Sequence, residues 1–285
     1  MKIKQALHST GQLSLNVAEV GSEGPLLVMF HGVTQRWQTF IPLISTLGLR
    51  HRLWLVDGRG HGESDRGVGY RVVDYIEDAC DLIRQLNVPV SVYGHSLGSM
   101  VAAGVAAELG STITAVVMED PPLHAMGERI GETHLLNFFK AMSKFAGTNQ
   151  DAGEVAGKLG DVTFHDPVSG SDIRLADVRD PIQRRFSAAC LTKLDPAVYE
   201  PIVAGRWLDG YHVERVFRSI VCPSLLLQAD VAAGGMLTEA DAEYVESLNK
   251  SLVRIPFSGI GHTIHTGATQ ALLNTVVAFL ESIAG

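Results

Sequence analysis

The sequence predicts an α/β protein with a mostly parallel central sheet, helices on both faces of the sheet and an inserted, mainly helical cap. Three observations lead to this prediction. Short apolar runs recur along the chain, segments of helical periodicity lie between them, and this alternation stops over residues 122–219 before it resumes. Strands that alternate with helices form parallel sheets, because each helix returns the chain to the same edge of the sheet.

The predicted strands of the first half of the chain are short. Residues 13–20 alternate apolar and polar side chains, which is typical of a strand with one buried face. The runs 26–30, 53–56, 90–93 and 115–118 are apolar throughout. Continuous apolar runs of this length indicate strands that are buried on both faces.

Helical periodicity separates these strands and returns near the C-terminus. In the first half it covers about residues 70–86 and 97–109. In the last part we expect, in chain order, a strand at 224–228, a helix at about 239–249, a strand at 252–255 and a helix at about 268–283. The core is therefore predicted to comprise residues 1–121 and 220–285, with 122–219 as the cap.

Composition and charge exclude several classes of function. The 285 residues carry a formal net charge of −8, and no cluster of Lys and Arg interrupts this acidity, so neither nucleic acid nor an anionic membrane is an expected partner. The N-terminal residues mix polar and apolar side chains without the hydrophobic stretch of a signal peptide, and the longest run of low polarity, 100–107, is too short to span a membrane. We therefore expect a cytoplasmic protein.

Cysteine usage points to no disulfide framework or metal site. Cys80, Cys190 and Cys222 are few and widely spaced, and we expect them to be buried. Neither a metal nor a cofactor is predicted.

The segment Gly94-His95-Ser96-Leu97-Gly98 is the most specific motif of the chain. It matches the G-x-S-x-G nucleophile elbow and lies directly after a predicted strand and before a predicted helix. The backbone at such a serine is strained, and the positions two before and two after it must lack bulk. The motif therefore predicts that Ser96 is a catalytic nucleophile.

A serine nucleophile requires a base, usually histidine. His262 follows Gly259-Ile260-Gly261 between the last predicted strand and the last predicted helix, where a loop could bring its imidazole to Ser96. His265 lies three residues further on and is the alternative. We predict His262 as the base.

Together with further signatures, these motifs resemble the α/β-hydrolase family over nearly the whole chain. The signatures are Phe30-His31-Gly32-Val33, Asp57-Gly58-Arg59-Gly60-His61-Gly62-Glu63-Ser64, the elbow at Ser96, and Gly261-His262. The resemblance implies the α/β-hydrolase fold and an oxyanion hole formed by the backbone N–H groups of Val33 and Leu97. It also implies that Asp57, Arg59 and His61 brace neighbouring turns.

The acid of the triad has three candidates. In the α/β-hydrolase fold the acid lies between the nucleophile and the histidine in sequence. Most relatives carry it after the strand that follows the cap, where this chain has Asp230 two positions early and Ala232 at the expected place. Glu119 and Asp120 follow the strand at 115–118, which is similar to zearalenone-type lactone hydrolases and some haloalkane dehalogenases. We prefer Glu119, because its longer side chain could reach His262, and keep Asp230 and Asp120 as alternatives.

The identity of the nucleophile narrows the reaction. Epoxide hydrolases and dehalogenases of this fold use an aspartate, because a serine would form an inert ether, so acyl transfer to water is expected here. We predict a hydrolase for a carboxylic ester or lactone of a small or medium hydrophobic molecule, whose pocket Phe138, Phe139 and Trp207 help to line. The alternatives are a carbon–carbon bond hydrolase for ring-cleavage diketones and a hydrolase-derived ligand receptor.

Overall fold

The computed structural model describes residues 2–127, 129–166 and 169–283, and a mixed sheet forms its centre. Across the sheet the strand order is β1-β2-β4-β3-β5-β6-β9-β10, with β1, β2 and β4 paired antiparallel and all other pairs parallel. The strands are β1 (Ile3–Ser9), β2 (Ser14–Val20), β3 (Leu26–Phe30), β4 (Arg52–Val56), β5 (Val90–His95), β6 (Ile113–Glu119), β9 (Ser224–Ala229) and β10 (Leu252–Phe257). The predicted fold class is confirmed.

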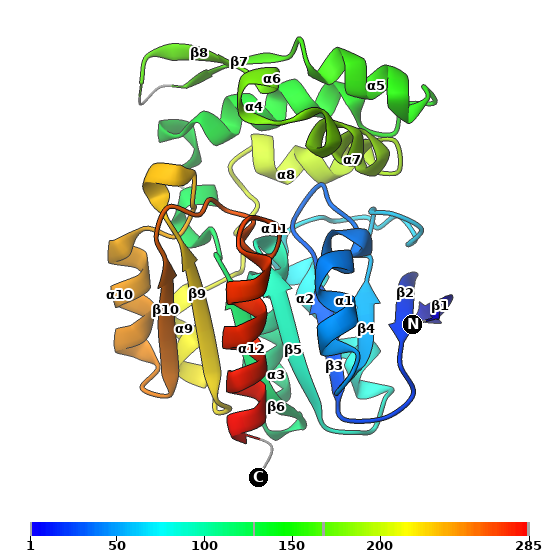
Figure 1. Cartoon of the computed structure of the whole chain (residues 1–285), viewed down its shortest axis with the longest axis vertical. Helices are drawn as coiled ribbons and strands as arrows, with labels where there is room; N and C mark the ends of the chain where they lie inside the picture. The colour runs from blue at the N-terminus through cyan, green and yellow to red at the C-terminus, as the bar shows by residue number, and fades with distance from the viewer. Residues whose placement is uncertain (1, 128, 167–168, 284–285) are drawn as a thin grey trace.

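Helices cover both faces of this sheet (Figure 1). One face carries α1 (Ile41–Leu47) and α12 (Thr269–Ile283), and the other carries α2 (Val72–Arg84), α3 (Leu97–Leu109), α9 (Val213–Ser219) and α10 (Glu239–Leu248). Alternate residues of β6 reach the two faces, as the period of a strand requires. Ala115 and Val117 pack on the side of α1 and α12, whereas Val116 and Met118 pack on the side of α3.

The central elements lie where the apolar runs predict them. Every residue of β3 is buried, as expected for a central parallel strand covered on both faces. The helix α3 begins directly after Ser96 and is buried from Leu97 to Ala106, which matches its lack of a polar face. The strand β1 is not predicted by the sequence, because it lies at the edge of the sheet and keeps most of its side chains exposed.

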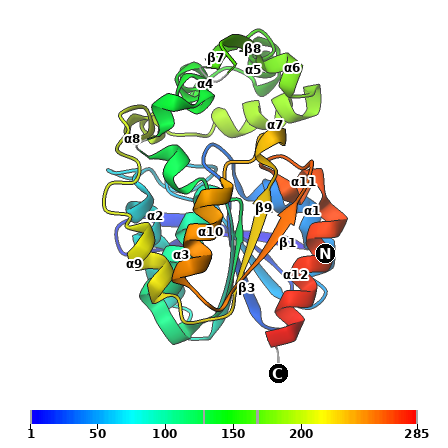
Figure 2. The same cartoon turned by 90° about the vertical axis from the view of Figure 1, so that its left-hand side faces the viewer.

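Between β6 and β9 the chain forms a layer over the carboxyl ends of the strands (Figure 2). This layer contains α4 (His134–Met142), α5 (Ala152–Leu159), α6 (Leu175–Val178), α7 (Pro181–Leu191) and α8 (Tyr199–Val203), with a hairpin of β7 (Thr163–Asp166) and β8 (Ser171–Arg174). The helix α9 also lies in the predicted cap range 122–219, but it packs against α3 and α10. No helix in the described part of the chain is both long and apolar enough to cross a membrane.

Candidate active site

Ser96 lies on the tight turn that joins β5 to α3. Its backbone has φ 56° and ψ −117°, a strained conformation for a residue with a side chain. A Cβ atom on Gly94 would overlap the carbonyl oxygen of Gly98, and one on Gly98 would overlap the carbonyl oxygen of Phe30. The two glycines of the motif therefore allow β3, β5 and α3 to meet at the nucleophile turn.

Two backbone amides beside this turn are free to bind an oxyanion. A Cβ atom on Gly32 would lie 3.1 Å from the Cβ of Ser96, so the loop after β3 runs directly along the nucleophile turn. Within the described residues, the structure gives neither the Val33 N–H nor the Leu97 N–H an acceptor. Unpaired N–H groups at such a place can stabilise a developing oxyanion without reorganisation.

His262 is held by Asp120. Its Nδ1 lies 2.6 Å from the Asp120 Oδ2, and the side chain of Asp120 is fully buried. The His262 ring packs against the His95 ring at 4.7 Å between centroids, and the His95 Nε2 donates to the His262 carbonyl oxygen at 3.0 Å. The histidine next in sequence to Ser96 thus fixes the loop that carries His262.

Backbone geometry explains why Asp120 reaches His262. Asp120 follows the last residue of β6 and has φ 45°, a left-handed conformation that aspartate tolerates better than most residues. Its carboxylate also accepts hydrogen bonds from the N–H groups of Ala229, Met236 and Leu237, which hold it at the end of β9. The Asp120 carboxylate is therefore fixed in position with Nδ1 of His262 as its side-chain donor.

The prediction that Glu119 contacts His262 is wrong. Glu119 continues the alternation of Ala115 and Val117, so its side chain points into the layer below α1 and α12. There it accepts hydrogen bonds from the backbone N–H of His265 at 2.9 Å and from its Nδ1 at 2.8 Å, and also from the hydroxyl of Tyr93. The strand period could have revealed this, whereas side-chain length was a misleading criterion.

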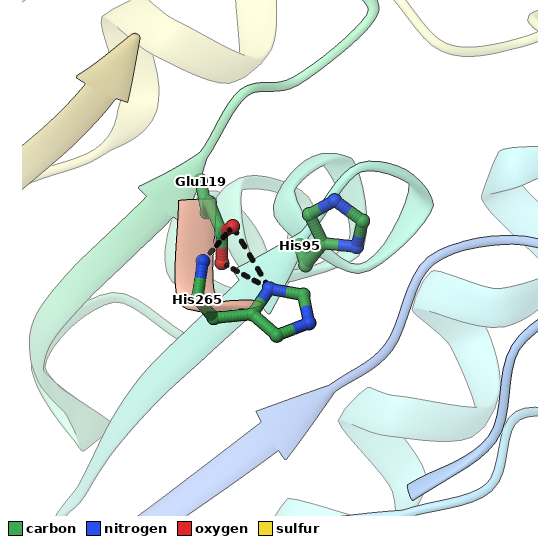
Figure 3. Close-up of side chains that lie close together, drawn as sticks. All are labelled: His95, Glu119 and His265. Atoms are coloured by element: carbon green, nitrogen blue, oxygen red, sulfur yellow. Dashed lines mark hydrogen bonds and ion pairs between the residues drawn. The ribbon is translucent and has the colours of Figure 1, made fainter. Parts of the chain in front are cut away.

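Glu119, His265 and His95 form a buried cluster below the nucleophile turn (Figure 3). Their ligand atoms lie within 4.8 Å of one another, which raises the question of a metal site. However, the Nδ1 of His265 carries the proton that it donates to Glu119, and its Nε2 is hydrogen-bonded to Thr39 at 2.7 Å. Because a metal would have to displace these bonds, the donor set fits a hydrogen-bonded support for the site better than a metal centre.

We expect Glu119→Gln to destabilise the protein in a pH-dependent way. Burial alone would raise the pKa of Glu119, but the charges of His265 and His95 and its hydrogen bonds lower it from 4.5 to about 2. A depressed carboxyl pKa stabilises the folded state above pH 4.5 and loses that contribution as the pH falls to 2. The expected difference is roughly 3 kcal/mol at neutral pH.

Denaturant unfolding of wild type and variant between neutral and acidic pH would measure this difference. It should be largest at neutral pH and shrink as the pH falls below about 4.5. A difference that is constant with pH would show that the Glu119 charge makes no such contribution.

Asp230 lies away from the His262 ring and braces a turn. Its carboxylate accepts hydrogen bonds from the N–H groups of Ala232 at 2.9 Å and of Gly259 at 2.8 Å, and both bonds lower its pKa. The Asp230 N–H also donates to the Ile260 carbonyl oxygen. Asp230 therefore holds the loop before His262 in place by hydrogen bonds to the backbone of Gly259 and Ile260.

The Asp57, Arg59 and His61 side chains form buried bracing interactions, as the family resemblance implies. Asp57 accepts from the Trp37 N–H at 2.7 Å, and Arg59 forms a two-pronged ion pair with Asp78. Burial, with the nearby His31 charge, lowers the pKa of His61 to about 3, and its Nε2 accepts from the Thr34 N–H. These residues fix the loop that follows the Val33 amide.

The three predicted pocket aromatics differ in their surroundings. Trp207 is fully buried in the core of the protein and presents no surface to a ligand, so its predicted place in the pocket wall is wrong. Phe139 is buried against Tyr199 and Phe138. Phe138 is only partly buried, and its ring centroid lies 5.2 Å from the guanidinium carbon of Arg179.

The cysteines Cys80, Cys190 and Cys222 are buried thiols, as expected.

Fold and site together define an α/β hydrolase: a mostly parallel central sheet with a serine at the nucleophile turn. Residues 27–272 match the sequence model of the Alpha/beta hydrolase family, and the chain belongs to this family. It is a hydrolase of this class.

Named relatives support the same class. A 2-(acetamidomethylene)succinate hydrolase of Mesorhizobium japonicum is 26% identical over 283 residues, which cover 95% of this chain and 93% of that protein. The crystal structure of an E-2-(acetamidomethylene)succinate hydrolase has a TM-score of 0.76 at 24% identity, covering 98% of this chain and 100% of the other. The enol-lactonase of Burkholderia xenovorans has a TM-score of 0.73 at 17% identity, with coverage of 97% and 100%. These structural likenesses concern the fold.

Proposed function

We propose that this protein hydrolyses a carboxylic ester or lactone of a small or medium hydrophobic molecule through an acyl-enzyme on Ser96. The arrangement of Ser96 on its strained turn and His262 on the carboxylate of Asp120, at 2.6 Å, carries this proposal. Asp120 replaces Glu119 as the proposed acid, because it is the carboxylate that binds the His262 ring.

The proposed reaction assigns one role to each group. The Ser96 Oγ attacks the carbonyl carbon while the Nε2 of His262 takes the hydroxyl proton. The N–H groups of Val33 and Leu97 stabilise the resulting oxyanion. Collapse of this intermediate expels the alcohol oxygen, which takes the proton from His262. Water then attacks the acyl-enzyme while His262 takes its proton. Collapse of the second intermediate releases the acid and returns the proton to the Ser96 Oγ.

Asp120 supports the proton transfer without moving. By accepting the Nδ1 proton of His262 in a hydrogen bond, it holds the tautomer whose Nε2 can accept a proton from the serine. Its negative charge stabilises the imidazolium that forms during attack. Phe138 is the cap aromatic that we propose for contact with the hydrophobic part of the substrate, because it keeps some exposed surface.

Amide substrates form a second candidate. The curated relative that covers 95% of this chain is named as a hydrolase of 2-(acetamidomethylene)succinate, a compound with an acetamido group. The same nucleophile, base and oxyanion donors would serve an amide, in which His262 protonates the leaving nitrogen.

A substrate panel tests the proposed function. We expect turnover of short-chain aryl esters or lactones, and loss of that turnover after treatment with a fluorophosphonate. Amides and ring-cleavage diketones complete the panel. Consumption of a yellow dienolate without cleavage of any ester would instead indicate a carbon–carbon bond hydrolase, and saturable binding without turnover would indicate a receptor.

A further inference from the structure

Two arginines between the core and the cap lack an acidic partner. Arg36 lies three residues after Val33, and Arg179 lies between α6 and α7. Both are only partly exposed, yet within the described residues neither has a carboxylate at ion-pair distance. By contrast, the buried guanidinium of Arg59 bonds Asp78 at 2.6 and 2.7 Å. A desolvated cation without a counter-ion is unfavourable, so these arginines point to an anion supplied from outside the chain.

The surroundings of Arg179 hold its charge without neutralising it. Its guanidinium carbon lies 5.2 Å from the Phe138 ring centroid, and its Nη1 donates to the Ser187 hydroxyl at 2.8 Å. Burial lowers the pKa of Arg179, which is the effect of a cation with too few compensating partners. An aromatic face and a hydroxyl orient the guanidinium, but its remaining N–H groups bond nothing else in the described chain.

Arg36 and Tyr199 contribute further unpaired donors. The Arg36 Nε and the Tyr199 hydroxyl are both shielded from solvent, and neither has a hydrogen-bond partner among the described residues. Tyr199 is 2% exposed, and its ring packs on Phe139 at 6.1 Å between centroids. Buried donors of this kind are rarely left unpaired unless a ligand or water binds them.

The buried thiol of Cys190 places these groups in one neighbourhood. Burial raises the pKa of Cys190 to about 12, and the charges of both Arg36 and Arg179 oppose that rise. Arg179 and Cys190 also act on the Tyr199 hydroxyl: burial raises its pKa, the charge of Arg179 lowers it and the nearby Cys190 raises it further. Arg36, Arg179 and Tyr199 therefore all lie in the neighbourhood of Cys190, which is near the C-terminal end of α7.

We infer that Arg36, Arg179 and Tyr199 form a subsite for a carboxylate carried by the acyl substrate of Ser96. The inference rests on the proposed function and names its substrate class: an ester, lactone or amide with a free carboxylate. The planar guanidinium of arginine matches a carboxylate in geometry and charge. Because Arg36 belongs to the loop that carries the Val33 amide, an anion bound there would orient the substrate carbonyl toward the oxyanion donors.

A matched pair of esters tests this subsite. The para-nitrophenyl monoester of glutaric acid carries a free carboxylate, and para-nitrophenyl pentanoate has the same acyl chain length without it. We expect wild type to prefer the anionic ester in kcat/KM by about 10-fold or more. Arg36→Gln and Arg179→Gln should each lower that preference by about 10- to 100-fold, and Arg36→Lys and Arg179→Lys by less.

Arg206→Gln is the control. Arg206 is exposed and forms no ion pair in the described chain, so its replacement makes the same change in net charge away from the proposed subsite. It should leave the preference within about threefold. A wild-type preference near one, or equal losses on both esters in the arginine variants, would overturn the inference while Ser96 hydrolysis remained intact.

Binding separates failure of the subsite from failure of the proposed function. If neither ester is hydrolysed, calorimetry on the Ser96→Ala variant compares monomethyl glutarate with dimethyl glutarate. Binding of the anion alone, lost on addition of Arg36→Gln, supports the carboxylate subsite even though the proposed esterase activity has failed. Equal binding of the two compounds, or none, overturns the subsite.

Discussion

Ser96→Ala is expected to abolish hydrolysis of every substrate that the wild-type protein cleaves, with a loss of about 10⁶-fold in kcat by analogy with other serine hydrolases. The substitution removes the attacking oxygen and leaves the oxyanion donors in place. The fold should be unaffected, because the Ser96 hydroxyl makes no hydrogen bond within the described residues and alanine fits the same turn. Turnover, melting temperature and mass-spectrometric mapping of a fluorophosphonate adduct on wild type would measure this.

Ser99→Ala is the matched control for that result. Ser99 lies three residues further along, and its hydroxyl donates to the carbonyl oxygens of Gly94 and Glu119 at 2.7 Å. Its loss should lower stability by about 1 kcal/mol or more, while Ser96 remains the labelled residue. An adduct on another residue, or turnover that survives Ser96→Ala, would show that the nucleophile is misassigned.

Asp120→Asn is expected to lower kcat by about four orders of magnitude at neutral pH. The amide keeps the size of the carboxylate but removes the charge that stabilises the imidazolium of His262. It also favours the tautomer in which the serine-facing nitrogen already carries a proton. Single-turnover kinetics together with the melting temperature would separate this loss from unfolding.

Glu119→Gln and Asp230→Asn are the two comparisons for Asp120→Asn. Glu119 binds His265 and Tyr93, so its amide should affect stability far more than the turnover of the folded fraction. Asp230 binds backbone N–H groups, which an asparagine oxygen can also accept from, so most turnover should remain. If either variant is the inactive one while Asp120→Asn stays active, the acid is a different carboxylate from the one proposed.

Two neighbouring residues at the end of β6 thus bind two histidines of one loop. Asp120 receives the Nδ1 proton of His262, and Glu119 receives that of His265. The first pair lies at the carboxyl edge of the sheet, and the second lies below α1 and α12. The buried pair ties the His262 loop to β6, and through Thr39 to the segment that follows the oxyanion loop.

Much of the architecture and the nucleophile were predictable from the sequence, because both depend on local patterns. Apolar runs indicated the buried parallel strands. The spacing of Gly94 and Gly98 around Ser96 indicated the nucleophile, because the turn at Ser96 leaves no room for a Cβ atom at either glycine. By contrast, β1 was not predictable, since an edge strand with exposed side chains has no apolar pattern to reveal it.

The partner of His262 was decided by the tertiary structure. Glu119 and Asp120 are adjacent acidic residues. The alternation of β6 directs Glu119 into the layer below α1 and α12, and the left-handed backbone of Asp120 directs its carboxylate onto the imidazole of His262. Likewise, the sequence suggests Trp207 as a pocket aromatic, but Trp207 lies in the core. Arg36 and Arg179 become informative only once the structure shows that neither has a carboxylate partner among the described residues. The sequence determined which chemical groups the protein contains and which turn carries its nucleophile. The packing of distant segments decided which carboxylate meets which histidine, because hydrogen bonds between residues more than a hundred positions apart leave no periodic signal in the chain.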